Sequence, residues 1–355
     1  MSSTPHAAAT LYGGQAVIEG VMMRGPEHFA VACRKQDGEI ALTCEIVPKV
    51  LRPAWQKLPV LRGAFALVDA MALGTRAMFW AAKVAEADIG GGAGVDSAAI
   101  RAAEELVGPV LGSAVAASDP VPAGAARTSG RVADVAIGSA MVTGLIFALV
   151  LIVVVPNLIL RGVQAAGVSV WWRLGLIDAC VRFTIFFGYI LAISRMGHVF
   201  RVFQYHGAEH KAINALEAHG ADRLTVDAAR AASRLHPRCG TSFVVIVMLL
   251  STVALIPFYG LPAFERVPIH LLLTLPVAGV SFELLRLAGK YRDNPVAAAL
   301  SRPGMWTQLL TTREPDDAQL AVAIASLRAV MNADRADSGG ARPDTAEQTA
   351  AAGVA

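Results

Sequence analysis

A long stretch without a single charged side chain most constrains how this chain can fold. Residues 135–160 are almost wholly apolar and carry no Asp, Glu, Lys or Arg. About 20 apolar residues in a helix cross the 30 Å hydrocarbon core of a bilayer, so this stretch predicts a transmembrane helix. Three further apolar stretches, 174–194, 241–259 and 267–287, predict three more. We therefore expect an α-helical polytopic membrane protein with four transmembrane helices.

Composition supports this class and excludes another. The chain is 55% hydrophobic and only 17% charged, whereas soluble chains average about 45–50% and about 25%. Its net charge of +3 provides no basic excess of the kind that binds phosphate backbones, so we expect no nucleic-acid partner.

The lysines and arginines predict the orientation. Of the 31, twelve precede residue 135, seven lie in 195–240 and eight follow residue 285. The short loops 161–173 and 260–266 hold only three. Because positive loops stay in the cytoplasm, we expect both termini and the 195–240 loop on the cytoplasmic side.

The segments outside the spans differ in character. Alternating apolar residues around Asp37-Gly38 indicate a hairpin, with an earlier strand over 15–23, so residues 12–58 predict a small cytoplasmic β-rich domain. The other expectations follow in chain order: an amphipathic helix on the membrane or against the bundle (60–85), a Gly/Ala-rich linker or insertion (88–130), the transmembrane domain (135–289), a cytoplasmic amphipathic tail helix (303–333) and a disordered end (336–355).

The 195–240 loop carries the residues best suited to chemistry. It contains five of the eight histidines, and His206-Gly-Ala-Glu209-His210 forms an H-x-x-E-H string. Two imidazoles four residues apart share one helix face and can bind one metal ion. Glu209 projects near that face and can act on a metal-bound water, as in the inverted H-x-x-E-H zinc enzymes. The alternative is that both histidines only bond backbone or lipid phosphate.

A second chelating pair ends the same loop. His236 and Cys239 are three residues apart, so the loop offers three imidazoles and one thiol, which are zinc-type ligands, although another divalent metal is possible. If all four residues ligate, the site is closed and structural. If three ligate, a water position stays open and Glu209 becomes a general base.

Charged residues within the predicted spans are further candidates. Glu283 lies about one turn from the cytoplasmic end of its span and can reach the loop or pair with Arg286. Asp178 and Arg182 are four residues apart, and we expect an ion pair, with a lipid headgroup as the alternative partner of Arg182.

Four stretches of the chain resemble the bacterial YqhQ-like family. They are G-G-Q-A-V-I-E-G-V-M-M-R-G-P at 13–26, R-V-F-Q-Y-H-G-A-E-H-K at 201–211, H-P-R-C-G-T-S-F at 236–243 and P-G-M-W-T-Q-L-L-T-T-R-E-P at 303–315. The resemblance covers about 12–332 apart from 88–130, and departs from the family pattern at Thr307-Gln-Leu-Leu. The family has no established function and is often described as a predicted metal-dependent enzyme. The positions that the resemblance marks are Glu19, Arg24, His206, Glu209, His210, His236 and Cys239.

These observations favour a zinc-dependent hydrolase at the cytoplasmic face of the bacterial inner membrane. His206 and His210 hold the metal with His236 or Cys239, and Glu209 is the catalytic residue. Expected partners are membrane lipids and a membrane-embedded or lipid-linked substrate or protein. The alternative is a non-enzymatic scaffold or assembly factor with a structural zinc site. A weaker third hypothesis, a transporter, rests on the charged residues in the spans.

Overall fold

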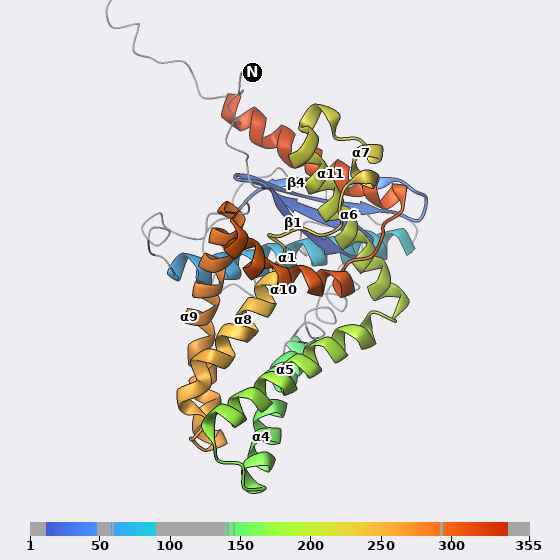
Figure 1. Cartoon of the computed structure of the whole chain (residues 1–355). Coiled ribbons are helices and arrows are strands. Elements are labelled where there is room, and N and C mark those ends of the chain that lie inside the picture. Colours follow the sequence, from blue (N-terminus) through green and yellow to red (C-terminus); the bar gives the residue numbers. More distant parts are fainter. Residues whose placement is uncertain are drawn as a thin grey trace, which may run out of the picture.

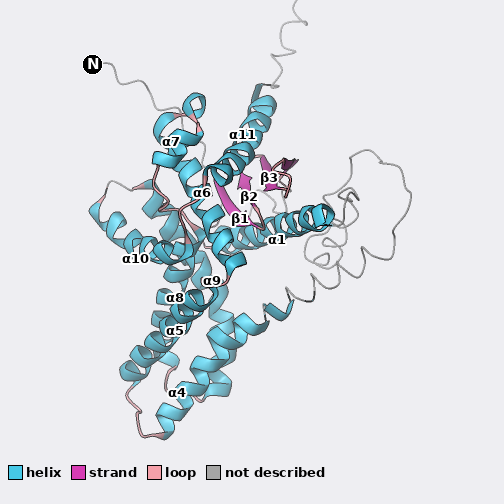
Figure 2. Cartoon of the chain, turned by 90° about the vertical axis from the view of Figure 1, so that its right-hand side faces the viewer, coloured by secondary structure: helices cyan, strands magenta, loops and turns pink. Residues whose placement is uncertain are grey.

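The computed structural model describes residues 12–47, 58, 60–89, 139, 142–144, 146–291 and 294–339. A bundle of long helices runs away from a small sheet, and shorter helices surround that sheet (Figures 1 and 2). The bundle comprises the π-helical η2 (Val150–Val154) continued by α4 (Val155–Ala165), α5 (Trp171–Ile193), α8 (Gly240–Leu255) and α9 (Ala263–Lys290). Most of the predicted linker, residues 90–130, lies outside the described residues.

The sheet has four antiparallel strands, one more than the sequence predicted. Their order is β1 (Gly13–Val17), β2 (Gly20–Arg24), β3 (His28–Arg34) and β4 (Ile40–Ile46). The hairpin predicted around Asp37-Gly38 is confirmed as β3–β4. The continuous strand predicted over 15–23 is wrong, because Val17 pairs with Gly20 and the two residues between them form a turn. Glu19 adopts a φ of +50° there, a left-handed conformation that is uncommon for residues other than glycine.

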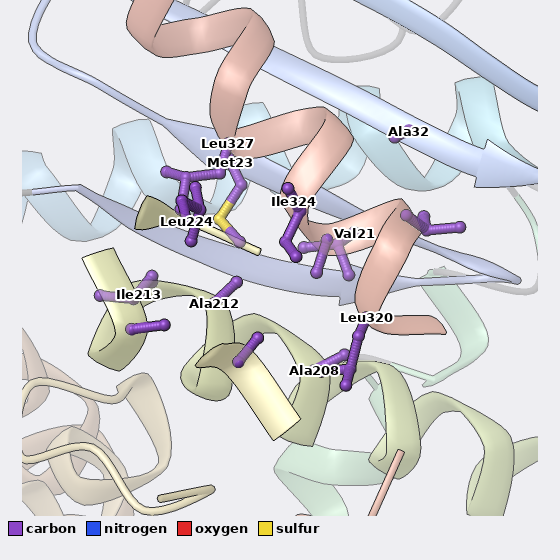
Figure 3. Packing of buried hydrophobic residues seen from close by; sticks show 14 of the residues in the cluster. Val21, Met23, Ala32, Ala208, Ala212, Ile213, Leu224, Leu320, Ile324 and Leu327 are labelled. Atoms are coloured by element: carbon purple, nitrogen blue, oxygen red, sulfur yellow. The ribbon is translucent and has the colours of Figure 1, made fainter. Parts of the chain in front are cut away.

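Helices distant in sequence cover both faces of the sheet. One face packs on α6 (Gly197–His219) and α11 (Asp317–Gly339), as Figure 3 shows around Val21 and Met23. The opposite face, with Met22, packs on α1 (Leu61–Ile89). Because both faces are buried, the interiors of β2 (21–23) and β3 (29–33) are apolar on both sides, and polar residues stand only at the strand ends.

Five described helices are long and apolar enough to cross a membrane, where four were predicted. They are Leu61–Asp88, Val142–Ala165, Trp171–Ile193, Gly240–Phe258 and Phe264–Ala288, consistent with a multi-pass membrane protein. The additional candidate is α1, which the sequence predicted as an amphipathic helix because four charged residues punctuate it. Figures 1 and 2 show α1 lying crosswise to α8 and α9 and against the sheet.

Two charged residues of the bundle form ion pairs, one within a helix and one between helices. The predicted pair is confirmed, because Arg182 Nε donates to Asp178 Oδ2 at 2.6 Å. The predicted partner of Glu283 is wrong: Arg62 of α1, not Arg286, donates two hydrogen bonds of 2.5 Å to its carboxylate. Gly63 and Gly279 bring α1 and α9 close together there, an approach that sequence alone does not reveal.

The segments predicted to share one side of the membrane do gather at one end of the bundle. The sheet, the helices α6 and α7 (Val226–Ala231), and the C-terminal helices all lie there (Figure 1). The tail predicted over 303–333 is helical but not one continuous helix, because α10 (Pro295–Thr311) ends before α11 begins. Pro315 disfavours helical geometry for the preceding residue. Since α11 extends to Gly339, it also includes the first part of the predicted disordered end.

Candidate functional site

The site is built on α6, which carries both histidines of the H-x-x-E-H string. His206 and His210 stand one turn apart, with ring centroids 4.5 Å apart. The helix ends at His219, and the φ of +78° at the following Gly220 is one that glycine adopts readily. His210 is buried, whereas His206 is partly exposed.

Backbone carbonyls orient both imidazole rings. His206 Nδ1 lies 2.8 Å from the carbonyl oxygen of Thr311, and His210 Nδ1 lies 2.7 Å from that of Arg234. A carbonyl can only accept, so each Nδ1 carries its proton and each Nε2 keeps a lone pair. Histidines that bind metals in proteins are usually held in this way.

Cys239 completes a group of three donors. It comes from the N-cap of α8, and its Sγ lies 3.2 Å from His206 Nε2. One ligand atom from each of His206, His210 and Cys239 lies within 4.8 Å of the other two. Two imidazole nitrogens and a thiol at this spacing suit tetrahedral zinc, with bonds of about 2.0–2.3 Å. The donor set and the oriented rings therefore fit the predicted metal.

His236 lies beside this group but does not belong to it. Its ring centroid is 5.7 Å from that of His210, and its Nε2 lies 3.9 Å from a carboxylate oxygen of Glu217. The nearby His236 ring, together with Arg238, lowers the pKa of Glu217 to about 2. Of the four predicted ligands, three converge and His236 flanks them.

Glu209 turns toward the sheet. Its carboxyl is buried, and a Cβ added to Gly14 of β1 would lie 3.1 Å from Glu209 Cδ. Burial raises the pKa of Glu209 to about 7, while the charge of His206 and a hydrogen bond from the Gly14 backbone act in the opposite direction. The carboxyl thus lies against β1, near enough to His206 for its charge to act, and it is not one of the three converging donors.

The N-terminal motif is attached to the site helix through Glu19. This residue occupies the β1–β2 turn, where Arg201 of α6 pairs with its carboxylate and Tyr205 donates its hydroxyl at 3.2 Å. Arg201 holds the pKa of Glu19 below its usual range. Tyr205 immediately precedes His206, so the two motifs are in direct contact.

Arg24 lines a cleft at the open end of the β1–β2 hairpin. The cleft measures about 340 Å³, and its lining includes Gly14, Leu73 of α1 and Arg238 of the site loop. Among the described residues the Arg24 guanidinium has no hydrogen-bond or ion-pair partner, and Asp69 is near enough to act on it electrostatically. The cleft therefore joins the N-terminal motif to the loop that supplies Cys239.

The two remaining candidates are separate from this group. Arg182 is held inside the bundle by Asp178, and Glu283 is held by Arg62 where α1 crosses α9. Their partners are Asp178 of α5 and Arg62 of α1, so these two ion pairs contribute to the packing of the long helices.

Sequence reasoning missed three residues that hold the site together. Gln308 of α10 exchanges two hydrogen bonds of 2.8 Å with the backbone of His236 and gives a third to Ser242. Lys211 and Asn214 bind backbone carbonyls of 230–235 and fasten that segment to α6. Asn214 lies one turn after His210 on the same helix face, which is a usable signal. Gln308 is 72 residues from its partner and gives none.

Comparison with known proteins identifies the family. A model of the family described as "Protein of unknown function (DUF1385)" matches residues 58–333. The chain is 32% identical over 333 residues to "Uncharacterized protein YqhQ" of Bacillus subtilis (strain 168), covering 92% of this chain and 94% of that protein. No solved structure matches. Neither name mentions a metal or a reaction, but both matches cover most of the chain and therefore establish its family. The chain belongs to the DUF1385 family of proteins of unknown function.

Proposed function

We propose that this protein is a zinc-dependent hydrolase that works at the cytoplasmic face of the bacterial inner membrane. The observation that carries the proposal is the convergence of three donors, with the Nδ1 of both histidines engaged by carbonyls. His206, His210 and Cys239 would hold the ion. Three protein ligands leave one tetrahedral position open, which is the arrangement of catalytic rather than structural zinc.

Glu209 is the general base in this proposal. Zinc bound by three protein ligands supplies a water whose pKa falls to about 7. Burial brings the pKa of Glu209 to about 7 as well, and a base is most effective when its pKa is near the working pH. The Gly14 backbone would hold the carboxyl in place between the sheet and the site.

The cleft suggests how a substrate is held. Its lining includes the apolar residues Met22 and Leu73 and two arginines, Arg24 and Arg238, of which Arg238 also pairs with Glu217. Such a lining suits a molecule with an apolar part and an anionic part, in keeping with the lipid-linked substrates favoured by the sequence. Arg24 is available for this contact because its guanidinium has no hydrogen-bond partner among the described residues.

The first experiment measures metal content by mass spectrometry on protein purified in detergent without chelators. We expect about one zinc per chain, lost in a His206→Ala/His210→Ala double variant. The matched control is His219→Ala, at the exposed end of the same helix. If wild type contains no metal, or if the double variant retains it, the proposed centre is wrong.

The second experiment separates catalysis from binding. Glu209→Gln keeps the size of the side chain and removes its ability to take a proton. We expect zinc content to stay at the wild-type level and hydrolysis of any identified substrate to fall by about 10²–10⁴, the usual contribution of a general base. Full activity in this variant would refute the role of Glu209.

The position of His236 favours a second candidate, a scaffold with a closed zinc site. Its ring lies beside that of His210, so a change of side-chain rotamer could add a fourth ligand. Cobalt substitution distinguishes the two functions. Absorption bands of a centre with one thiolate and an exchangeable water support the hydrolase, whereas four protein ligands, reduced to three by His236→Ala, support the scaffold.

A further inference from the structure

A polar cluster buried in the bundle lies apart from the metal centre. It is formed by α4, α5 and α9, near the short connections at the end of the bundle away from the sheet (Figure 1). Its members are less than a tenth exposed: Asn157, Asp178, Arg182, Tyr259, Arg266 and His270. Ionisable residues that face the interior of a membrane protein are costly and commonly mark a functional site.

Hydrogen bonds link five of the six members, and His270 interacts with them through charge. Tyr259 donates its hydroxyl to Asp178 Oδ2 at 2.8 Å, and the same oxygen accepts from Arg182 Nε. Arg266 Nε donates to Asn157 Oδ1 at 2.7 Å, and its guanidinium lies 5.9 Å from the Tyr259 ring centroid. Tyr259 therefore connects the carboxylate with the second arginine.

Three polar atoms of the cluster have no hydrogen-bond partner among the described residues. They are Asp178 Oδ1, Arg266 Nη2 and His270 Nδ1. His270 is close enough to respond to the charges of Asp178 and Arg182. An unmatched buried polar atom destabilises the folded state, and more so if the group is charged, so three in one cluster indicate that a ligand binds there.

The charges of the cluster indicate the kind of ligand. Two guanidinium groups face one carboxylate, and Asp178 is the only buried carboxylate in the described part of the bundle. The cluster thus carries an excess positive charge that a monovalent anion would neutralise. Because Asp178 Oδ1 can only accept when ionised, an anion beside it must bring a hydrogen of its own.

We infer that this cluster binds a small monovalent oxyanion that retains a hydroxyl hydrogen, such as bicarbonate or dihydrogen phosphate. Its oxygens would accept from Arg266 Nη2 and the His270 ring, and its O–H would donate to Asp178 Oδ1. A halide offers no such hydrogen, so it should bind less well. The inference is independent of the zinc centre.

The test measures the apparent Tm of the full-length protein in detergent. Sodium bicarbonate at pH 8 and sodium phosphate at pH 6 are each titrated against sodium chloride at equal ionic strength. A ligand that binds only the folded state raises stability in a saturable way. We expect a saturable rise with either oxyanion, and at least a tenfold weaker response to chloride.

Variants assign the response to the cluster. Arg266→Gln and His270→Ala should each abolish saturation, whereas Arg161→Gln, on an exposed residue of α4, should leave it unchanged. Two variants are used because Arg266 also binds Asn157 and its loss can impair folding. The His206→Ala/His210→Ala variant should keep the full response, which excludes anion binding to the metal. Equal effects of chloride and oxyanions, or saturation that persists in both variants, would show that water alone satisfies the cluster and would overturn the inference.

Discussion

The glycine inside the H-x-x-E-H string gives the sharpest test of how the site is built. A Cβ on Gly207 would overlap the carbonyl oxygen of Arg313 and lie 3.5 Å from Pro315 Cδ. The α10–α11 connection cannot move away freely, because the Arg313 N–H donates to the Phe203 carbonyl at 2.8 Å. We therefore expect Gly207→Ala to destabilise the protein, although alanine is the better helix former.

Two opposing terms set the size of the effect. Overpacking against a fixed backbone costs about 1–3 kcal/mol, and replacing a helical glycine by alanine returns up to about 1 kcal/mol. The net expectation is a loss of about 1–2 kcal/mol. Gly188→Ala in α5 is the control, because an added Cβ there meets nothing within 4 Å.

The assay compares apparent Tm in detergent with zinc content. The His206 imidazole is oriented by Thr311, two residues before Arg313, so displacing the connection should also turn that ring. We expect Gly207→Ala to lower the apparent Tm by several degrees and to reduce zinc per chain, with neither change in Gly188→Ala. If Gly207→Ala unfolds at the wild-type temperature, the close approach has no energetic importance and the reasoning fails.

Three other predictions follow from contacts around the sheet and the bundle. Arg201 lowers the pKa of Glu19 from 4.5, so the folded state binds this proton less readily than the unfolded state, and the resulting stabilisation is present above pH 4.5 and lost as pH falls through the lowered pKa. Glu19→Gln should therefore make the denaturation midpoint depend less on pH over this range, and a pH profile identical to that of wild type would contradict the prediction. Gln308→Leu should cost about 2 kcal/mol or more by leaving buried partners unbonded, measured as a fall in Tm that is absent from the exposed control Leu309→Ala. Glu283→Gln should increase proteolysis of α1, since its pair with an α1 arginine is lost; equal cleavage rates would show that packing alone holds α1.

Local patterns predicted the parts of the fold that depend on local physics. The bundle helices followed from apolar length, the β3–β4 hairpin from Asp37-Gly38, and the ion pair of Asp178 from the residue one turn away. The β1–β2 turn was missed because Glu19 lacks the Asn-Gly signature of such turns. The sequence also could not show that α1 would lie against the sheet, because that position depends on surfaces far apart in the chain.

The candidate site shows the same division. The spacing of His206 and His210 predicted a shared helix face, and of the two further ligands predicted from the sequence the structure brings Cys239 to them. The carbonyls that orient the imidazoles were beyond prediction, because any residue supplies a carbonyl and only the fold selects one. Glu209 was expected to face the metal, yet a glycine of β1 lies against its carboxyl. Whether it acts as a base remains a prediction for the Glu209→Gln experiment.

During synthesis, the strands of the sheet are made long before α11, the helix that covers one face of the sheet. Ser326 of α11 donates to the carbonyl of Ala30 in β3, a contact that spans 296 residues. At roughly 5–20 residues per second, about 15–60 s separate the emergence of these two partners from the ribosome. During that time the helices of the bundle are made, and the apolar face beneath α11 has no cover from that helix. A ribosome that stalls before α11 would therefore leave on its nascent chain an aggregation-prone sheet tethered to the membrane.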